Sequence, residues 1–416
     1  MALPFETART LILETVLVPL AEPVNLQALV GRVLADDFHA PCDLPRWDNS
    51  EMDGFAVRAT DCRPGSRLRV VGQLPAGASA TGLKVVPGTA VRIMTGAPVP
   101  AGCDAVVPIE NTVSEGDTVT LTQGVEPGDY IRRQGSDMVA GEAVIAAGTV
   151  LRPAEINLLA ACGCTRAGVF RRPKVAILST GDELVPPGET PGPGQIVDSN
   201  AYSLLAAVTE IGAVAQLLGI ARDNQEELRD KIGRGLDADV FITSAGVSAG
   251  DRDLVRDVLA ELGVELRFWK VAMKPSGPTA FGLKGKTMVF SLPGNPVSSM
   301  VGFEQLVRPA LLKMMGYSRI FRPRVDATMK TPLRNETGKT RFLRVRVTAT
   351  AEGLVAESAG NQNTGILGTM VRANGFAVLA PECREVAVGG QQSVEIFGPW
   401  PSCLSAEFPS QAFKKS

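Results

Sequence analysis

Three loops of the sequence combine acidic, hydroxyl and glycine residues in spacings that suit phosphate and metal-ion chemistry. The first is STGDEL at residues 179–184, which follows an apolar run and offers two hydroxyls and two adjacent carboxylates. Because adjacent side chains diverge in most conformations, we expect one carboxylate to face a ligand and the other to hold the chain. The loop is therefore a candidate metal site through one of its two acids, Asp182 or Glu183, and a helix-capping loop is the alternative interpretation of the same residues.

The second loop is TSAGVSAGDRD at residues 243–253. Its glycines let the backbone come close to a ligand, and amides at the start of a following helix favour phosphate, so Gly246, Ser248 and Gly250 are candidate substrate-binding residues. Asp251 and Asp253 would repel a phosphate unless a divalent cation lay between them, and Mg2+ binds carboxylate and phosphate oxygens together. The alternative is that one of these aspartates is an ordinary helix N-cap.

The third loop is SLPGNPVSS at residues 291–299. Asn295 suits an N-cap and Pro296 suits the first helical position, so a helix should begin here with free amides pointing outward. Pro293 and Gly294 complete a stiff turn, which favours preorganised binding, and Ser298 follows within the first helical turn. A plain turn is the alternative.

Two lysines lie just upstream of the third loop, in WKVAMKP at residues 269–275. The segment is typical of a strand, and Lys270 and Lys274 would share one of its faces, about 13 Å apart at ~3.3 Å per residue. They would then contact separated anionic groups of one elongated ligand. Exposed lysines are usually only solvated, which is the alternative.

Two segments nearer the N-terminus, each expected to form a turn, carry polar groups of the same kind. DNSEMDGFA at residues 48–56 places three acids within six residues, and RIMTGAP at residues 92–98 ends a strand in a stiff turn. Asp53 and Thr95 are the candidates there. Asp53 followed by Gly54 is also typical of a hairpin turn.

The elements around the three main loops predict a doubly wound α/β domain over residues 172–318. Apolar runs (KVAILST, AVAQLLGI, DVFITS, KTMVFSL) alternate with helical patterns (AYSLLAAVTEIG, NQEELRDKIGRGL, DLVRDVLAELG). Such alternation indicates a mainly parallel sheet. Ligands of these sheets bind outside the carboxyl ends of the strands, which is where the three loops begin.

The rest of the chain predicts smaller domains, so the expected fold class is multidomain and elongated, α/β plus β. Short strands between turns indicate a β-rich insertion domain at residues 46–138 and a C-terminal β domain at residues 319–416. Helical spacing over residues 1–45 and 139–171 predicts one discontinuous, elongated helical domain. Within it, Pro153 suits a first helical turn and Gly163 a helix end.

Composition excludes several classes of protein. The net charge is -2, so nothing global attracts nucleic acid or an anionic membrane. One histidine excludes a multi-histidine zinc site, and seven cysteines without zinc-like spacing indicate reduced thiols in a cytoplasmic protein. We expect no signal peptide and no transmembrane helix. The chemistry must then rest on carboxylates, lysines, backbone amides or a bound ion.

Seven segments together resemble the MoeA family of molybdopterin molybdenumtransferases, which is related to the E domain of gephyrin: DNSEMDGFAVR, RIMTGAPVPAGCDAVVPIE, STGDEL, DSNAYSL, TSAGVSAGD, KVAMKPSGP and SLPGNPVSS. The segments stand in the family's order and spacing, and the resemblance as a whole runs from about residue 5 to about residue 400. The resemblance implies a homodimer of four-domain subunits with a MogA-like α/β domain. It also implies a Mg2+-dependent reaction in which adenylylated molybdopterin is hydrolysed, AMP is released and molybdate is inserted at the dithiolene.

The resemblance also implies roles for residues at matching positions. The implied catalytic residues are Asp53, Thr95, Glu183, Lys270 and Lys274, and the implied metal ligands are Glu183, Asp251 and Asp253. The implied substrate-binding residues are Gly246, Ser248, Gly250, Pro293, Gly294, Asn295, Pro296, Ser298 and Arg344. In the expected mechanism the lysines neutralise phosphate charge while a molybdate oxygen or a water attacks phosphorus.

Three departures from the family pattern put local contacts in doubt. Ala245 stands where the family has a second glycine, Ser276-Gly277 moves the glycine of a PGKP-like segment by one position, and Asn363-Thr364 lies where a QGSH-like stretch is common.

A molybdopterin adenylyltransferase and a non-enzymatic scaffold are alternative functions, and an upstream molybdopterin adenylyltransferase is a possible partner. The choice between molybdate and tungstate stays open.

Overall fold

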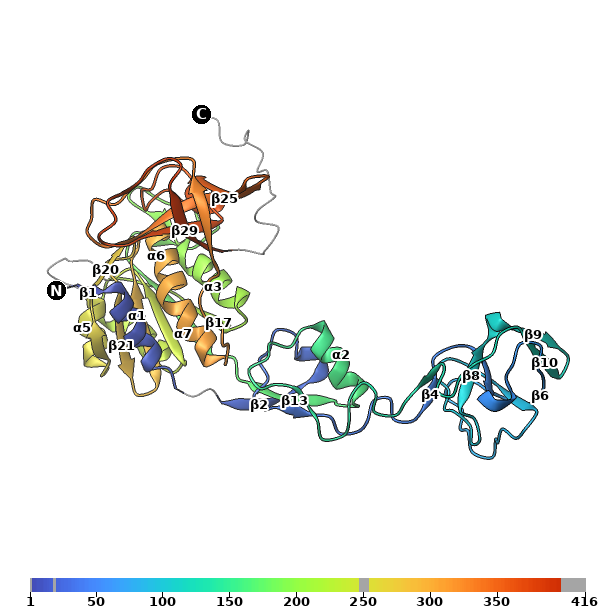
Figure 1. Ribbon diagram of the computed structural model, residues 1–416. Helices are drawn as coiled ribbons and strands as arrows, with labels where there is room; N and C mark the ends of the chain where they lie inside the picture. Colours follow the sequence, from blue (N-terminus) through green and yellow to red (C-terminus); the bar gives the residue numbers. More distant parts are fainter. Residues whose placement is uncertain (1, 18–19, 247–253, 398–416) are drawn as a thin grey trace. The chain divides into compact units, whose positions relative to one another are not determined.

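The computed structural model describes residues 2–17, 20–246 and 254–397, and the chain divides into two compact units (Figure 1). Unit 1 comprises Met1–Glu22, Gly31–Val33 and Val169–Ser416. Unit 2 comprises Pro23–Val30 and Leu34–Gly168. No helix in the described part of the chain has the length and apolar character needed to cross a membrane.

A six-stranded sheet forms the centre of unit 1. Its strands lie in the order β17 (Val214–Ala221), β14 (Lys174–Thr180), β18 (Val240–Ser244), β22 (Thr287–Leu292), β21 (Ala280–Lys284) and β19 (Glu265–Phe268). The first four strands are parallel and the last two are antiparallel. The parallel strands are the four apolar runs of residues 172–318, so the prediction of a mainly parallel sheet is confirmed.

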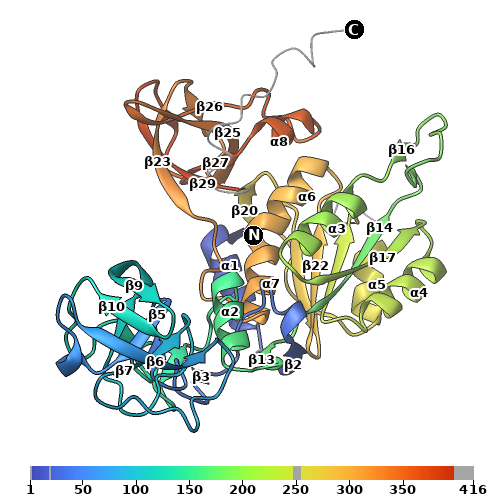
Figure 2. The ribbon, with the colours of Figure 1, turned by 90° about the vertical axis from the view of Figure 1, so that its right-hand side faces the viewer.

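Helices cover both faces of this sheet because its central strands are apolar on both sides. In β14, Val175 and Ile177 enter one core, while Ala176 and Leu178 enter the other. The first core receives α1 (Phe5–Glu14), α3 (Asn200–Glu210), α6 (Pro296–Gly302) and α7 (Arg308–Met314), and the second receives α4 (Gln225–Gly235) and α5 (Leu254–Glu261). Figure 2 shows these two helical layers.

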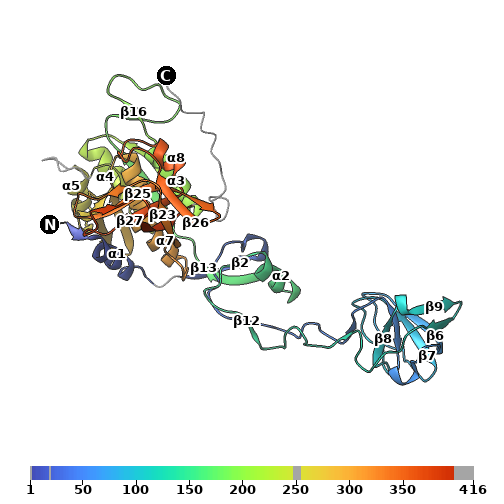
Figure 3. The same cartoon turned by 45° about the horizontal axis from the view of Figure 1, so that its top comes forward.

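A second sheet of unit 1 gathers strands from three parts of the chain (Figure 3). Its strands are β1 (Leu3–Pro4), β20 (Val271–Lys274), β25 (Thr340–Thr350), β26 (Gly353–Ser358), β23 (Arg324–Met329), β29 (Gln391–Ile396) and β27 (Gly375–Leu379). Because β25 pairs with both β26 and β27, the last five strands close on themselves around one apolar core. The short α8 (Gly368–Arg372) follows the 361–367 loop.

A second six-stranded sheet, in unit 2, carries the short strands expected at residues 46–138. They lie in the order β8 (Ala105–Pro108), β5 (Gly54–Val57), β7 (Thr89–Ile93), β6 (Arg67–Leu74), β10 (Thr118–Leu121) and β9 (Thr112–Glu115). Phe55 and Val57 enter one core and Ala56 enters another, so both faces of this sheet are covered. Such alternation follows from the two-residue period of a strand.

The expectation of one helical domain from residues 1–45 and 139–171 needs correction. Residues 1–22 belong to unit 1, because Phe5, Ala8 and Ile12 form a buried stripe of α1 inside the α/β core. Phe5 also stacks edge-on against Phe342, with 5.1 Å between ring centroids. Unit 2, which the structure describes throughout, has one α-helix, α2 (Pro153–Ala161); the segments around it pair as short strands, such as β3 (Phe38–His39) with β12 (Ala143–Ile145).

Candidate active site

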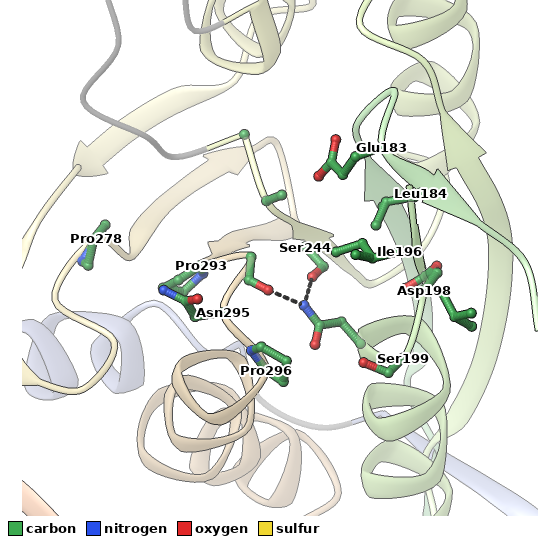
Figure 4. Close-up of a pocket in the computed structure, with 15 residues that line it drawn as sticks. Glu183, Leu184, Ile196, Asp198, Ser199, Ser244, Pro278, Pro293, Asn295 and Pro296 are labelled. Atoms are coloured by element: carbon green, nitrogen blue, oxygen red, sulfur yellow. Dashed lines mark hydrogen bonds between the residues drawn. The ribbon is translucent and has the colours of Figure 1, made fainter. Parts of the chain in front are cut away.

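A pocket of about 480 Å³ lies at the carboxyl ends of β14, β18 and β22 (Figure 4). Five segments of unit 1 line it: residues 183–184, residues 196–200, residues 244–246, Pro278 and residues 293–296. The pocket thus gathers parts of all three loops that the sequence singled out. Of the expected site residues it contains Glu183, Gly246, Pro293, Gly294, Asn295 and Pro296.

The loop after β14 separates its two acids. The Asp223 amide donates to Asp182 Oδ1 over 3.1 Å, so this carboxylate holds the chain, while Glu183 lines the pocket. The Arg222 guanidinium fixes the same loop by donating to the Asp182 and Leu184 carbonyls, each over 3.0 Å. The sequence predicted that one of these two adjacent carboxylates would hold the chain and that the other would face a ligand. Arg222 was missed, because a lone arginine after a strand carries no distinctive pattern.

A glycine makes room for the Glu183 carboxylate. Gly181 has φ +142°, and a Cβ built on it would overlap both carboxylate oxygens of Glu183. Only glycine combines that backbone conformation with that free space. The position of Glu183 at the pocket therefore depends on Gly181.

The loop after β18 enters the pocket through a residue with a left-handed backbone. Ala245 has φ +76°, and its amide donates to the Leu292 carbonyl over 3.0 Å. Gly246 follows with φ +74° and also lines the pocket. The predicted ligands Ser248, Gly250, Asp251 and Asp253 lie outside the described residues.

The loop after β22 leads into α6, as the sequence predicted, with Asn295 at the N-cap and Pro296 as the first helical residue. The expectation of several free amides there is only partly met. Proline has no N–H, the Val297 amide donates to the Thr364 carbonyl over 3.2 Å, and the Ser299 amide donates to the Asn295 carbonyl over 2.9 Å. The loop therefore forms a stiff wall of the pocket and offers few free backbone N–H donors.

The start of α3 is a part of the site to which the sequence analysis assigned no role, although DSNAYSL is one of the segments that resemble the family. Asp198, Ser199 and Asn200 line the pocket, and Asp198 and Asn200 are buried. The Asp198 carboxylate accepts a hydrogen bond from the Ala201 amide over 3.1 Å and so caps the helix. The signal in the sequence was DSN directly before a helical pattern, which is indistinguishable from an ordinary cap.

The two lysines lie beside the pocket's strands but in the other sheet of unit 1. Lys274 ends β20, which pairs with β25 in register Lys274↔Arg341, and Lys270 precedes the strand. Both side chains are exposed, and neither lines the pocket. The expected strand over this segment is present, but its partner strands come from outside residues 172–318.

Asp53 and Thr95 form a pair of their own in unit 2. The backbone amide and the hydroxyl of Thr95 both donate to Asp53 Oδ1, each over 2.7 Å. These two hydrogen bonds, the backbone one first, lower the pKa of Asp53 below its ordinary value. Gly54 beside them is required by packing, since a Cβ there would overlap the Val107 carbonyl.

Ser298 and Arg344 are buried and do not line the pocket. The Arg344 guanidinium donates to the carbonyls of Asn361 and Asn363, each over 3.2 Å, and burial lowers its pKa to about 10. These contacts hold the 361–365 loop, whose Thr364 carbonyl meets α6. Arg344 thus touches protein rather than the pocket.

The charges on the pocket wall are negative. Glu183 and Asp198 are its charged residues, and no lysine or arginine lines it in the described part of the chain. Within residues 2–17, 20–246 and 254–397, no three His, Cys, Asp or Glu side chains cluster closely enough to hold a metal ion. A metal site here would need additional oxygen ligands.

Comparison with known proteins identifies the family. Three family models match: the MoeA N-terminal region (domain I and II) at residues 3–163, a probable molybdopterin binding domain at residues 176–313, and the MoeA C-terminal region (domain IV) at residues 326–397. Molybdopterin molybdenumtransferase 2 of Mycobacterium tuberculosis is 40% identical over 384 residues, which are 89% of this chain and 94% of that protein. The chain belongs to the MoeA family of molybdopterin molybdenumtransferases.

Other MoeA relatives agree over nearly the full length. The molybdopterin molybdenumtransferase of Haemophilus influenzae is 36% identical over 400 residues, covering 95% of this chain and 98% of that protein. The crystal structure of a molybdopterin biosynthesis MoeA protein from Pyrococcus horikoshii superposes with a TM-score of 0.83 at 32% identity, covering 96% of this chain and 100% of that one. The predicted family, the multidomain α/β plus β fold and the transferase class are thereby confirmed.

Two departures from the MoeA sequence pattern have a structural consequence. Ala245 and Ser276, where the resemblance to the family led us to expect glycine, adopt φ +76° and φ +70°. Both residues therefore keep the left-handed backbone that glycine favours, at a steric cost of about 1 kcal/mol each. Ser276 is further held by a 2.9 Å hydrogen bond between its hydroxyl and that of Thr279.

Proposed function

We propose that this chain inserts molybdate into adenylylated molybdopterin with release of AMP. The observation that carries the proposal is the pocket at the carboxyl ends of the parallel strands, all of which lies within the segment that matches a probable molybdopterin binding domain. Relatives named molybdopterin molybdenumtransferase span the same segment and most of the remaining chain. A molybdopterin adenylyltransferase or a scaffold explains that extent less well.

Mg2+ is part of the proposal. A phosphate-bearing substrate would be repelled by Glu183 and Asp198 on the pocket wall, where no described basic residue offsets them. Mg2+ is typically bound by one or two carboxylates together with substrate phosphates, so this donor set fits it. Glu183, with Asp251 and Asp253, would hold the ion. When bound, it would neutralise phosphate charge that develops during the reaction.

The chain's own residues bind and orient the substrate around that ion. The stiff wall at residues 293–296 and the glycine backbone at Gly246 bound the space for the phosphates. Lys270 and Lys274, exposed and without a hydrogen-bonded partner among the described residues, supply positive charge for an anionic group. A molybdate oxygen or a water attacks the phosphorus of the adenylyl group, and the bond from that phosphorus to the oxygen of the molybdopterin phosphate breaks. Attack by water releases AMP directly. Attack by molybdate forms an adenylyl–molybdate, and AMP leaves when a dithiolene sulfur binds molybdenum and the Mo–O bond to AMP breaks.

The remaining assignments rest on the family resemblance. Asp53 and Thr95 are assigned to catalysis, with Ser248 and Gly250 in the loop that receives the substrate. We further propose a homodimer, an upstream molybdopterin adenylyltransferase as supplier of the substrate, and a cytoplasmic location, where the six described cysteines, all free thiols, stay reduced. The division of the β-rich insertion at residues 46–138 from the α/β domain at residues 172–318 and a β domain beyond residue 319 belongs to the same proposal.

The experiment measures AMP release from adenylylated molybdopterin with Mg2+ and molybdate. Wild type and a Glu189→Gln variant should release AMP, because Glu189 is exposed and has no interaction with the pocket. Glu183→Gln should lower the rate at least tenfold, because it removes a cation-holding charge. Formation of adenylylated molybdopterin from ATP without molybdate, and no AMP release in wild type, would favour the adenylyltransferase instead.

A further inference from the structure

The carboxamide of Asn200 joins two walls of the pocket. Its Nδ2 group donates to the Ser244 hydroxyl over 2.9 Å and to the Gly294 carbonyl over 2.8 Å. A backbone carbonyl can only accept, so the nitrogen and not the oxygen faces Gly294. Both N–H groups of the amide are therefore used, one on each wall.

The two acceptors lie where the backbone pairing of β18 and β22 comes to an end. Ser244 is the last residue of β18, and Gly294 lies two residues beyond the end of β22. The strands remain paired up to the register Ser244↔Leu292, after which the Ala245 amide makes one more hydrogen bond to the Leu292 carbonyl. Past that point, a Cβ on Gly294 would lie 3.2 Å from the Ala245 Cβ, so the loops touch there without further backbone pairing.

Asn200 itself is held firmly on a third segment. It is the first residue of α3, whose Ala201 and Leu204 are buried in the α/β core. Asp198 caps this helix through the Ala201 amide, and the Asp198 amide donates to the Val185 carbonyl over 2.9 Å. The carboxamide is thus presented from a fixed helix end, and it adds two hydrogen bonds at the place where the backbone pairing of the two segments stops.

The remaining polar atom of Asn200 distinguishes a site residue from a purely stabilising one. Its Oδ1 is buried and has no hydrogen-bond partner in the described part of the chain. An unsatisfied buried carbonyl destabilises a fold, so stability alone favours another residue here. An asparagine at this position is explained by a need for its two donors, one for each wall of the pocket.

We propose that Asn200 is a positioning residue that sets the separation of the β18 and β22 walls and thereby shapes the pocket for the phosphate-bearing part of the substrate. This inference rests on the proposed function for the identity of that substrate. Asn200 does not itself act on the reacting atoms. Its removal should therefore weaken substrate binding more than it slows the chemical step.

The test compares Asn200→Ala with a matched control, Asn335→Ala. Asn335 is also buried and also donates from its amide to two separate segments, the Lys339 and Ala380 carbonyls, but it lies in the loop before β25 and does not line the pocket. Steady-state AMP release should give a KM for adenylylated molybdopterin raised about tenfold in Asn200→Ala, with kcat changed much less. In Asn335→Ala the KM should stay within twofold of wild type. Asn200→Asp should behave like Asn200→Ala, because a carboxylate cannot donate to Gly294.

A second readout does not depend on activity. Hydrogen exchange at the Ala245 amide should become faster in Asn200→Ala and stay unchanged in Asn335→Ala, because only the first variant frees the two loops. Wild-type KM and unchanged Ala245 exchange in Asn200→Ala would overturn the inference. Absence of AMP release from wild type would instead overturn the proposed function, and the exchange comparison would still decide whether Asn200 fixes the loops.

Discussion

Gly181→Ala should displace the Glu183 carboxylate without removing any charge from the pocket. The added Cβ would overlap both Glu183 carboxylate oxygens, so the side chain must move by about 1 Å to reach ordinary contact distance. Gly188→Ala is the matched control: Gly188 also has a left-handed backbone, with φ +98°, and a Cβ there would meet nothing within 4 Å. The pair separates the cost of the backbone from the cost of moving Glu183.

The magnitudes follow from these two terms. An alanine held in a glycine-type backbone region costs about 1–3 kcal/mol, which both variants share. For a unit of this size that is a loss of roughly 4–8 °C in melting temperature at the middle of the range. Displacing a reacting or metal-holding group by about 1 Å costs up to ~100-fold in rate, and only Gly181→Ala suffers this loss.

The assay pairs thermal unfolding with AMP release over a range of Mg2+ concentrations. We expect similar melting temperatures for the two variants, together with a rate at least tenfold lower and a higher Mg2+ requirement in Gly181→Ala alone. Equal rates in Gly181→Ala and Gly188→Ala would refute the reasoning, because the location of the Glu183 carboxylate would then be unimportant. The rate of Glu183→Gln, which lacks the carboxylate charge, gives the lowest rate expected and is the reference for the rate lost in Gly181→Ala.

Three further predictions concern stability and titration. Ala245→Gly should raise the free energy of unfolding by about 1 kcal/mol in urea denaturation, because it removes the steric strain of an alanine at φ +76°. A free energy of unfolding lower than that of wild type would show that Ala245 is not strained. Thr95→Val should raise the pKa of Asp53 in an NMR titration, but only part of the way to its ordinary value, because the Thr95 backbone amide still donates to it. The pKa of Asp53 is lower in the folded than in the unfolded protein, so its hydrogen bonds stabilise the fold only while Asp53 is ionised. Any loss of stability in the variant should therefore be seen at neutral pH and vanish once Asp53 is protonated. Burial raises the pKa of Cys62 and Cys103 to about 11, so at pH 8 about one thiol in 10³ is ionised. Iodoacetamide reacts with the thiolate and should therefore label both cysteines slowly until the protein unfolds. Rapid labelling of the folded protein would show that burial does not protect these thiols.

The sequence predicted those parts of the site that depend on local pattern. Each of the three main loops follows a continuous apolar strand and precedes a helical pattern, so their common place at one edge of a parallel sheet followed from topology alone. The α6 start at Pro296 was predictable for the same reason, because an N-cap residue and a proline in the first turn are local signals. The divergence of adjacent side chains predicted that Asp182 and Glu183 would have different roles, and the structure shows that Asp182 holds the chain while Glu183 lines the pocket.

The parts that could not be predicted depend on contacts between distant segments. β20 was read as part of residues 172–318, yet it pairs with β1 and β25, and nothing within WKVAMKP shows that preference. The Val297 amide looked free because its acceptor, the Thr364 carbonyl, comes from a loop 67 residues later. α1 has an apolar stripe that would suit any core, and only the complementary surface of α7 and β20 decides which one it joins.

The charge on the pocket wall links the site to the chemistry proposed for it. A pocket built to bind a phosphate without help would place a lysine, an arginine or a row of amides on its wall. Here the described wall carries Glu183 and Asp198, and the α6 start has lost the Val297 amide to Thr364. An anionic substrate can occupy such a pocket only if positive charge enters with it or approaches from outside the wall. In the function proposed above, a bound divalent cation would supply the first and the exposed Lys270 and Lys274 would supply the second. The same wall that repels a bare phosphate would then make binding depend on both.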